Sequence, residues 1–300
     1  METEMINQID FWIIGAQKSG TTSLHNYLSQ HQDIFMPPTK EIHFFNDDEF
    51  WKQGRSYLNS FYDGYKSEQV VGGAYVHTIF FEKNITRLKE HNPNIKLIAL
   101  LRNPVERAYS AYWFAKKNGW ETLESFEDAL DAEEKRLKGN LQEQKELTYL
   151  SHGKYIEQLK PYLDSFDRSQ IKIILTDELK ANAQQTTLDL FAWLGVKTGD
   201  SNINTSKKIN SSGMPRYPVL QKHLLQENNF KKSIRKITSP KQRLIFKNIF
   251  IEPILKFNSK PFIYPSMNKN TKQELSSYFK AYNSRLAKLI NKDLSAWDES

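Results

Sequence analysis

The chain has 300 residues, of which 39% are hydrophobic, 13% are aromatic and none is cysteine, and its formal net charge is +7. This composition suffices for a sizeable globular core, while the lack of cysteine excludes disulfides, thiolate metal sites and a cysteine nucleophile. The longest apolar runs are too short to span a bilayer, and the acidic first residues are unlike a secretion signal. We therefore expect a soluble, unexported, cytoplasmic protein without a membrane span.

Short buried runs alternate with helical segments through the first two thirds of the chain. Parallel strands are expected at residues 10–15, 69–73, 95–101 and 171–176, and helices at 22–30, 84–91, 104–118, 121–146, 155–166 and 184–194. This order predicts an α/β fold, a P-loop-like parallel β-sheet flanked by helices on both faces. Residues 197–218 are rich in loop-forming residues and predict a long loop that orders on binding. Two more helices, at 219–226 and 271–290, are expected to close the chain.

We expect a single domain over residues 1–300, with its core at about 10–195 and a loop and helical C-terminal part at about 196–300. The charge is unevenly distributed along it. Residues 201–250 contain eleven Lys or Arg and one acid, whereas residues 121–146 contain nine acids and four bases. Both segments can be interpreted as solvated faces. The basic segment can alternatively be interpreted as a surface that binds an anionic ligand or substrate.

The first candidate site is the stretch GAQKSGTT at residues 15–22. It lies between an expected strand and an expected helix, the order that a phosphate-binding loop requires. Gly15 and Gly20 keep the P-loop spacing, but the lysine is Lys18 and position 21 is threonine. Backbone amides, the positive end of the helix dipole and nearby hydroxyls would together hold an anion. The hydroxyls are those of Ser19, Thr21, Thr22 and Ser23.

A second candidate anion site follows the strand at residues 95–101. Arg102 leaves the carboxyl end of that strand, Pro104 suits a first helical turn and Ser110 lies further along the helix. Ligands of open α/β sheets collect at the carboxyl ends of strands. Arg102 binds a second anion of the same ligand, or else it pairs with Glu106 or caps a helix.

These motifs resemble those of sulfotransferases that use 3′-phosphoadenosine 5′-phosphosulfate (PAPS), especially the heparan-sulfate type and its bacterial relatives. Residues 15–22 resemble the 5′-phosphosulfate loop, and residues 101–110 (LRNPVERAYS) resemble the 3′-phosphate motif. PTKEIHFF at 38–45, GKY at 153–155 and LINKDLSAW at 289–297 resemble three further family segments. The resemblance covers about residues 10–297.

The resemblance implies sulfuryl transfer from PAPS, with 3′-phosphoadenosine 5′-phosphate as product and no metal. Lys18 would stabilise the leaving phosphate, Glu41 would act as general base, and His43 would be its partner or an alternate base. Cofactor contacts would also come from Tyr155 and, more weakly, from the late loop. The late-loop residues are Ser212, Gly213 and Arg216.

Acceptor-side residues would be Glu41 and His43 together with Phe45, Asn46, Tyr75 and His77. The sequence departs from the glycan-acting relatives here, because Asn46 replaces an aspartate and GGAYV at 72–76 replaces an acid- and proline-containing pattern. We therefore expect a small natural product, glycolipid or sugar carrying a hydroxyl or amine. The remaining histidines form no metal-binding pattern and are interpreted as solvated or hydrogen-bonded. They are His25, His31, His91, His152 and His223.

Two other functions remain as alternatives. A P-loop kinase or NTPase would share the loop and the fold, but the missing lysine at position 21 disfavours it. A non-catalytic nucleotide- or nucleic-acid-binding module would use the basic segment, but residues 219–250 lack interleaved basic and aromatic residues. Nucleic acid is therefore not an expected partner, and the sequence leaves the oligomeric state open.

Overall fold

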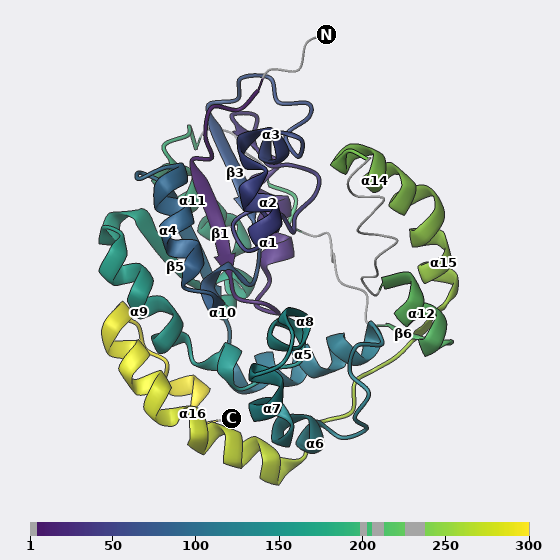
Figure 1. The fold of residues 1–300 in the computed structure, drawn as a ribbon. Coiled ribbons are helices and arrows are strands. Elements are labelled where there is room, and N and C mark those ends of the chain that lie inside the picture. Colours follow the sequence, from purple (N-terminus) through teal and green to yellow (C-terminus); the bar gives the residue numbers. More distant parts are fainter. Residues whose placement is uncertain (1–4, 199–202, 206–212, 226–237, 300) are drawn as a thin grey trace. The chain divides into compact units, whose positions relative to one another are not determined.

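The structure, a computed structural model, describes residues 5–198, 203–205, 213–225 and 238–299. The chain forms two compact units (Figure 1). Unit 1 comprises residues 1–102 and 156–209, and unit 2 comprises residues 103–155 and 210–300. The expected division into a core at about 10–195 and a C-terminal part stays a prediction.

Unit 1 contains a five-stranded sheet in the order β2-β3-β1-β4-β5, with every pairing parallel. The strands are β1 (Phe11–Gly15), β2 (Ile34–Phe35), β3 (Val70–Ala74), β4 (Lys96–Leu101) and β5 (Ile171–Leu175). The four strands expected from buried apolar runs are confirmed. Only β2 was not expected, because two residues are too few to show a pattern. With β1 in the centre, the loops after β3, β1 and β4 leave the same edge of the sheet side by side.

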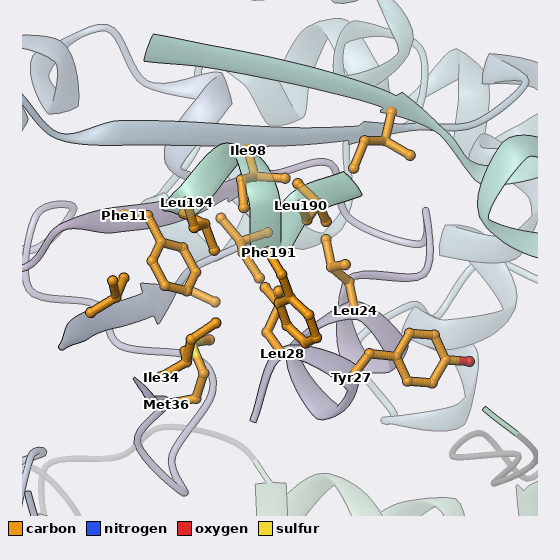
Figure 2. Close-up of a cluster of buried hydrophobic side chains, with 14 of the residues drawn as sticks. Phe11, Leu24, Tyr27, Leu28, Ile34, Met36, Ile98, Leu190, Phe191 and Leu194 are labelled. Atoms are coloured by element: carbon orange, nitrogen blue, oxygen red, sulfur yellow. The ribbon is translucent and has the colours of Figure 1, made fainter. Parts of the chain in front are cut away.

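One face of this sheet is covered by α1 (Thr21–Leu28) and α11 (Ala183–Leu194). Their apolar residues, among them Leu24, Leu28 and Phe191, form a buried cluster with Phe11 of β1 and Ile98 of β4 (Figure 2). Side chains alternate along a strand, so Trp12 points to the opposite face. The predicted P-loop-like parallel sheet with helices on both faces is confirmed.

The opposite face is covered by aromatic side chains and by α4 (Lys83–His91) and α9 (Tyr155–Ser165), each of which donates a side-chain hydrogen bond to the Thr78 carbonyl. The Trp12 ring meets Phe45 edge-on, with ring centroids 5.0 Å apart, and its Nε1 donates to Thr78 Oγ1 at 3.0 Å. The hydroxyl of Tyr162 donates to the Thr78 carbonyl at 2.6 Å. The helices of unit 1 besides α1 and α11 are α2 (Asp48–Lys52), α3 (Gly54–Asn59), α4 (Lys83–His91), α10 (Thr176–Ala181) and α9 (Tyr155–Ser165), whose first residue belongs to unit 2.

Unit 2 is mainly helical. Its helices are α5 (Pro104–Lys117), α6 (Phe126–Asp131), α7 (Glu133–Leu137), α8 (Leu141–Glu146), α12 (Pro218–Leu225), α14 (Pro240–Phe246), α15 (Glu252–Phe257) and α16 (Lys269–Ile290). A π-helical turn, Lys247–Ile251, joins α14 to α15, and β6 (Gly213–Pro215) pairs antiparallel with β7 (Ser259–Pro261). The core of the unit contains Ala108 and Tyr112 of α5 with Leu275 and Phe279 of α16. The run from α14 to α15 was not expected from the sequence.

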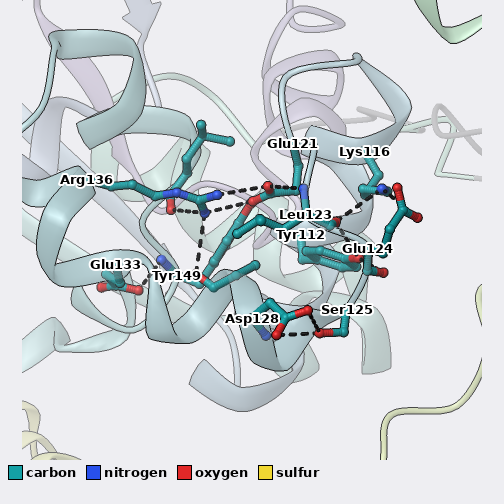
Figure 3. A network of polar contacts seen from close by, with 12 residues as sticks. Tyr112, Lys116, Glu121, Leu123, Glu124, Ser125, Asp128, Glu133, Arg136 and Tyr149 are labelled. Carbon is teal, nitrogen blue, oxygen red and sulfur yellow. Dashed lines mark hydrogen bonds and ion pairs between the residues drawn. The ribbon is translucent and has the colours of Figure 1, made fainter.

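The acidic segment is partly internal, so interpreting it as a solvated face is wrong for two of its carboxylates. Glu121 and Glu133 are each 4% exposed. Arg136 donates to both oxygens of Glu121, at 2.7 and 2.8 Å, and the Tyr149 hydroxyl donates to Glu121 Oε2 at 2.7 Å (Figure 3). Burial acts to raise the pKa of Glu121, but the hydrogen bonds from Arg136, Leu123 and Tyr149 outweigh it and lower that pKa.

Glu133 uses its carboxylate differently, as an acceptor for the main chain. It receives the backbone N–H groups of Tyr149, Leu150 and Ser151, each at 2.6 Å. Glu121 and Glu133 therefore fix the segment that leads into the GKY motif at residues 153–155. Buried carboxylates are stable only when they are fully hydrogen-bonded, and here both are.

Candidate active site

The glycine loop after β1 lies where the sequence places it, and its backbone geometry explains its glycines. Gly15 has φ +149°, and a Cβ built there would lie 2.7 Å from both the Val76 carbonyl oxygen and Ile79 Cγ2. Gly20 has φ +97° and precedes α1 in the left-handed conformation. Lys18, between them, also has a positive φ of 67°. These conformations turn the backbone sharply into the helix, a geometry suited to an anion cradle.

The loop contains a buried hydroxyl that the structure leaves available. Ser19 is fully buried, and within the described residues its Oγ has no hydrogen-bond partner. The next three hydroxyls, Thr21, Thr22 and Ser23, lie in the first turn of α1, where backbone N–H groups lack intrahelical partners. An unpaired buried hydroxyl is costly, so this one is suited to a bound anion.

Thr176, which the sequence did not single out, fixes this loop to the sheet. Its Oγ1 lies 2.7 Å from the carbonyl oxygen of Ser19 and 2.9 Å from that of Leu101. It is buried at the start of α10, directly after β5. A threonine following a buried strand carries no sequence signal of this bridging role.

The two candidate anion motifs meet within unit 1. Arg102 follows β4, the neighbour of β1, and its Nη1 donates to the Lys18 carbonyl oxygen at 3.4 Å. This contact places the guanidinium beside the loop that carries the candidate catalytic lysine. The role of Arg102 in binding a second anion of the same ligand stays a prediction.

Glu41 lies on the other side of the loop. It forms a parallel bridge with Ala74 at the end of β3, and the Ile42 N–H donates to the Ala74 carbonyl at 3.0 Å. One carboxylate oxygen, Oε1, accepts from Lys40 Nζ, and the other, Oε2, accepts from the Val76 N–H at 3.1 Å. Lys18 and Arg102 therefore follow the adjacent strands β1 and β4, and Glu41 is bridged to the last residue of β3, the other neighbour of β1.

The other predicted acceptor-side residues are packed together near Glu41. The His43 ring lies against Tyr75, with centroids 4.4 Å apart, and Tyr75 meets His77 edge-on at 5.4 Å. Phe45 and Asn46 are almost fully buried, and Asn46 Oδ1 accepts from Asn84 Nδ2 at 2.6 Å. Their acceptor-binding roles stay predictions, since the structure gives Phe45 and Asn46 packing contacts.

His25 adjoins the pair formed by Lys40 and Glu41. It lies on α1, and its Nε2 is buried without a hydrogen-bond partner among the described residues. Its pKa is lowered to about 4, mainly by burial and also by the Lys40 ammonium, while Glu41 and a backbone hydrogen bond at Pro37 act in the opposite direction. His25 is thus a neutral imidazole beside the Lys40–Glu41 pair.

The unusual glycines at residues 72–73 have a packing reason. A Cβ at Gly72 would lie 2.2 Å from Phe11 Cζ, and a Cβ at Gly73 would lie 2.0 Å from Trp12 Cζ3. Aromatic residues in β1 thus require glycine at the facing positions of β3. The departure from the glycan-acting pattern at Gly72 and Gly73 is thus explained by the aromatic rings of β1, which occupy the space that larger side chains would need.

The remaining predicted cofactor residues belong to unit 2. Ser110 lies half-buried on α5, whose N-cap is Asn103. Tyr155 is buried with its ring centroid 6.1 Å from that of Trp297, and a Cβ at Gly153 would lie 2.8 Å from the Phe279 ring. The GKY motif is therefore packed against α16 and the chain's final segment.

The late loop is described only in part. Gly213 is buried in β6, while Arg216 is exposed and its backbone N–H donates to the Asn258 carbonyl at 2.6 Å. Ser212, and half of the predicted long loop at residues 197–218, lie outside the described residues. The cofactor roles of these three residues stay predictions.

A parallel α/β sheet with a glycine loop, a helix N-terminus and cationic residues at adjacent strand ends defines a P-loop-like, anion-binding protein. The family model described as "Sulfotransferase domain" matches residues 8–257 of this chain. The chain belongs to the sulfotransferase family.

A sulfotransferase crystal structure from Alicyclobacillus acidocaldarius is similar at a TM-score of 0.70 and 30% sequence identity, covering 97% of this chain and 99% of that one. The bifunctional heparan sulfate N-deacetylase/N-sulfotransferase 1 of Caenorhabditis elegans is 26% identical over 95% of this chain and 30% of its own length. The membrane-associated sulfotransferase kil1 of Dictyostelium discoideum is 35% identical over 44% of this chain and 30% of its own length. The chain thus spans less than a third of the length of these curated relatives.

Proposed function

We propose that this protein transfers a sulfuryl group from PAPS to a hydroxyl or amine of a small natural product, glycolipid or sugar. The observation that carries the proposal is the placement of Lys18 and Arg102 after the adjacent parallel strands β1 and β4, with Glu41 bridged to the end of β3 on the other side of β1. PAPS has two separated anionic groups, the 5′-phosphosulfate and the 3′-phosphate. The glycine loop with Lys18 provides one cationic position for them, and Arg102 provides the other.

Donor binding is supported by the loop itself. Gly15 allows the sharp turn of the loop beside Val76 and Ile79, and Ser19 Oγ supplies a buried hydroxyl without a partner in the described structure. These features fit the 5′-phosphosulfate end of PAPS, and Arg102 fits its 3′-phosphate. Lys18 belongs to the same loop, so its ammonium would meet the negative charge that develops on the leaving 5′-phosphate.

Glu41 is the proposed general base. Lys40 and the Val76 N–H each bind one of its oxygens, which fixes the orientation of the carboxylate. Each carboxylate oxygen has a second lone pair, so the group still has acceptor capacity. As the acceptor oxygen or nitrogen forms its bond to sulfur, the bond from sulfur to the 5′-phosphate oxygen breaks, and the acceptor's proton passes to Glu41.

The acceptor class can be tested by incubating the protein with PAPS and a panel of alcohols, amines and glycans, and measuring the mass gained by each. A sulfated product from at least one small alcohol, amine or sugar is expected. Nucleotide turnover with ATP and magnesium, without sulfation, would instead support the kinase alternative. Binding of nucleotide with no turnover of any donor would support a non-catalytic module.

The assignment of Arg102 has its own test. Arg102→Ala should weaken binding of 3′-phosphoadenosine 5′-phosphate by about tenfold to a hundredfold, because a charge-assisted contact to phosphate is lost. Binding of adenosine 5′-phosphosulfate, which lacks the 3′-phosphate, should change little. Equal weakening of both ligands would show that the second-phosphate assignment is wrong.

A further inference from the structure

Unit 2 exposes an apolar stripe that the proposed reaction does not use. It lies on the helical run of residues 240–257, formed by α14, the π-helical turn and α15 (Figure 1). Six of its side chains are between 40% and 79% exposed. They are Ile245, Phe246, Ile249, Phe250, Ile254 and Phe257.

The spacing of these residues places them on one side of the helix. Phe246, Phe250 and Phe257 recur at intervals of about one or two turns, and Ile249 and Ile254 lie beside them. Phe246 and Phe250 contact each other, with ring centroids 5.0 Å apart. The other side of the run carries the half-buried residues Leu244, Ile251 and Leu255. The helical run therefore has one apolar side that is half-buried and a second apolar side that is exposed.

Basic residues flank the outward stripe. The run contains Lys241, Arg243, Lys247 and Lys256 against a single acid, Glu252. Arg243 lies three residues before Phe246, Lys247 directly follows Phe246, and Lys256 directly precedes Phe257, so basic residues adjoin the stripe along its length. Lys247 Nζ is 3.3 Å from Glu252 Oε1, and both side chains remain more than a third exposed. An exposed pair of this kind is weak, so the surface keeps its positive charge.

We propose that residues 240–257 form a docking helix for the surface of an anionic lipid bilayer. Aromatic and branched apolar residues on one face, with lysine and arginine adjoining them, suit a helix that lies in the headgroup region. Charge complementarity selects an anionic surface, because basic residues near such a membrane each contribute to binding. A second copy of this chain would bring the same positive charges to the contact, and a nucleic-acid duplex keeps the faces of its bases stacked inside, away from the exposed phenylalanines.

The test is sedimentation of the full-length protein with phosphatidylcholine vesicles that contain or lack phosphatidylserine. The protein should sediment with phosphatidylserine vesicles, should bind those of pure phosphatidylcholine at least about tenfold more weakly, and should dissociate as salt is raised. Phe246→Ser with Phe250→Ser should reduce binding by about tenfold or more. Lys247→Glu with Lys256→Glu should reduce it by about fivefold per residue or more.

Matched changes on α16 serve as controls. Leu289 is 37% exposed and Lys280 is exposed, so Leu289→Ser and Lys280→Glu make the same chemical changes on another helix. Both should bind vesicles as the wild type does. All these positions are at the surface, so circular dichroism and nucleotide binding should show that each variant folds.

Several results would overturn the proposal. They are no binding to phosphatidylserine vesicles, equal binding to both vesicle types, or unchanged binding of the Phe246 and Phe250 double variant. Loss of a dimer in that variant, without any lipid binding in the wild type, would identify the stripe as a contact between copies. The test measures binding only, so its outcome is independent of sulfuryl transfer.

Discussion

Stability at mildly acid pH is predicted to depend on His25. Its pKa is lowered from 6.5 to about 4 by burial and by the Lys40 ammonium. The unfolded chain therefore binds a proton at a pH where the folded protein does not, and the free energy of unfolding falls as the pH decreases from about 6.5 towards 4. A difference of roughly 2.5 units corresponds to about 3 kcal/mol in full, of which about 2 kcal/mol is lost between about pH 8 and pH 5.

The measurement is urea unfolding of the wild type and of His25→Gln at these two pH values. The glutamine variant cannot titrate, so its stability should fall by about 2 kcal/mol less than that of the wild type. Asn26→Gln, a change at the next position of α1, should keep the wild-type difference. If His25→Gln loses as much stability as the wild type, the neutral, buried state assigned to His25 is incorrect.

Two further changes test the contacts that hold the site and unit 2. Thr176→Val removes the hydroxyl that bridges the Ser19 and Leu101 carbonyl groups. The variant should lose about 1–3 kcal/mol of unfolding free energy, and its KM for PAPS should rise. If the unfolding free energy and the KM are both unchanged, the bridging role is contradicted. Arg136→Met leaves the Glu121 carboxylate buried without its cation and should cost about 3–5 kcal/mol, measured by urea unfolding. Adding Glu121→Leu should restore part of that loss, and a further additive loss would argue against a coupled pair.

The sheet and the loop motifs were predictable because their signals are local. Four strands appear as apolar runs, and the loop at residues 15–22 combines a strand end, two glycines and a helix start within a few positions. The proximity of Lys18 and Arg102 also followed, because parallel strands bring their carboxyl ends to one edge.

The parts that were missed depend on contacts between distant residues. Glu121 and Glu133 belong to a sequence that reads as a charged surface, and only the fold brings Arg136 and three backbone N–H groups to them. The roles of His25 and Thr176 likewise depend on partners that are distant in sequence or lie across the sheet. The docking helix did have a local signal that was overlooked, since Ser239 caps α14 and Pro240 follows it.

The central claim is that Lys18 and Glu41 carry out sulfuryl transfer at the end of the sheet. It is tested most directly by measuring sulfate transfer from PAPS, and binding of 3′-phosphoadenosine 5′-phosphate, in Lys18→Ala and Glu41→Gln. Exposed Lys52→Ala and Glu90→Gln serve as matched controls and should behave as the wild type. We expect both site variants to lose activity by about a hundredfold or more, with nucleotide binding retained in Glu41→Gln. Wild-type activity in Lys18→Ala, or loss of nucleotide binding in Glu41→Gln, would contradict the account.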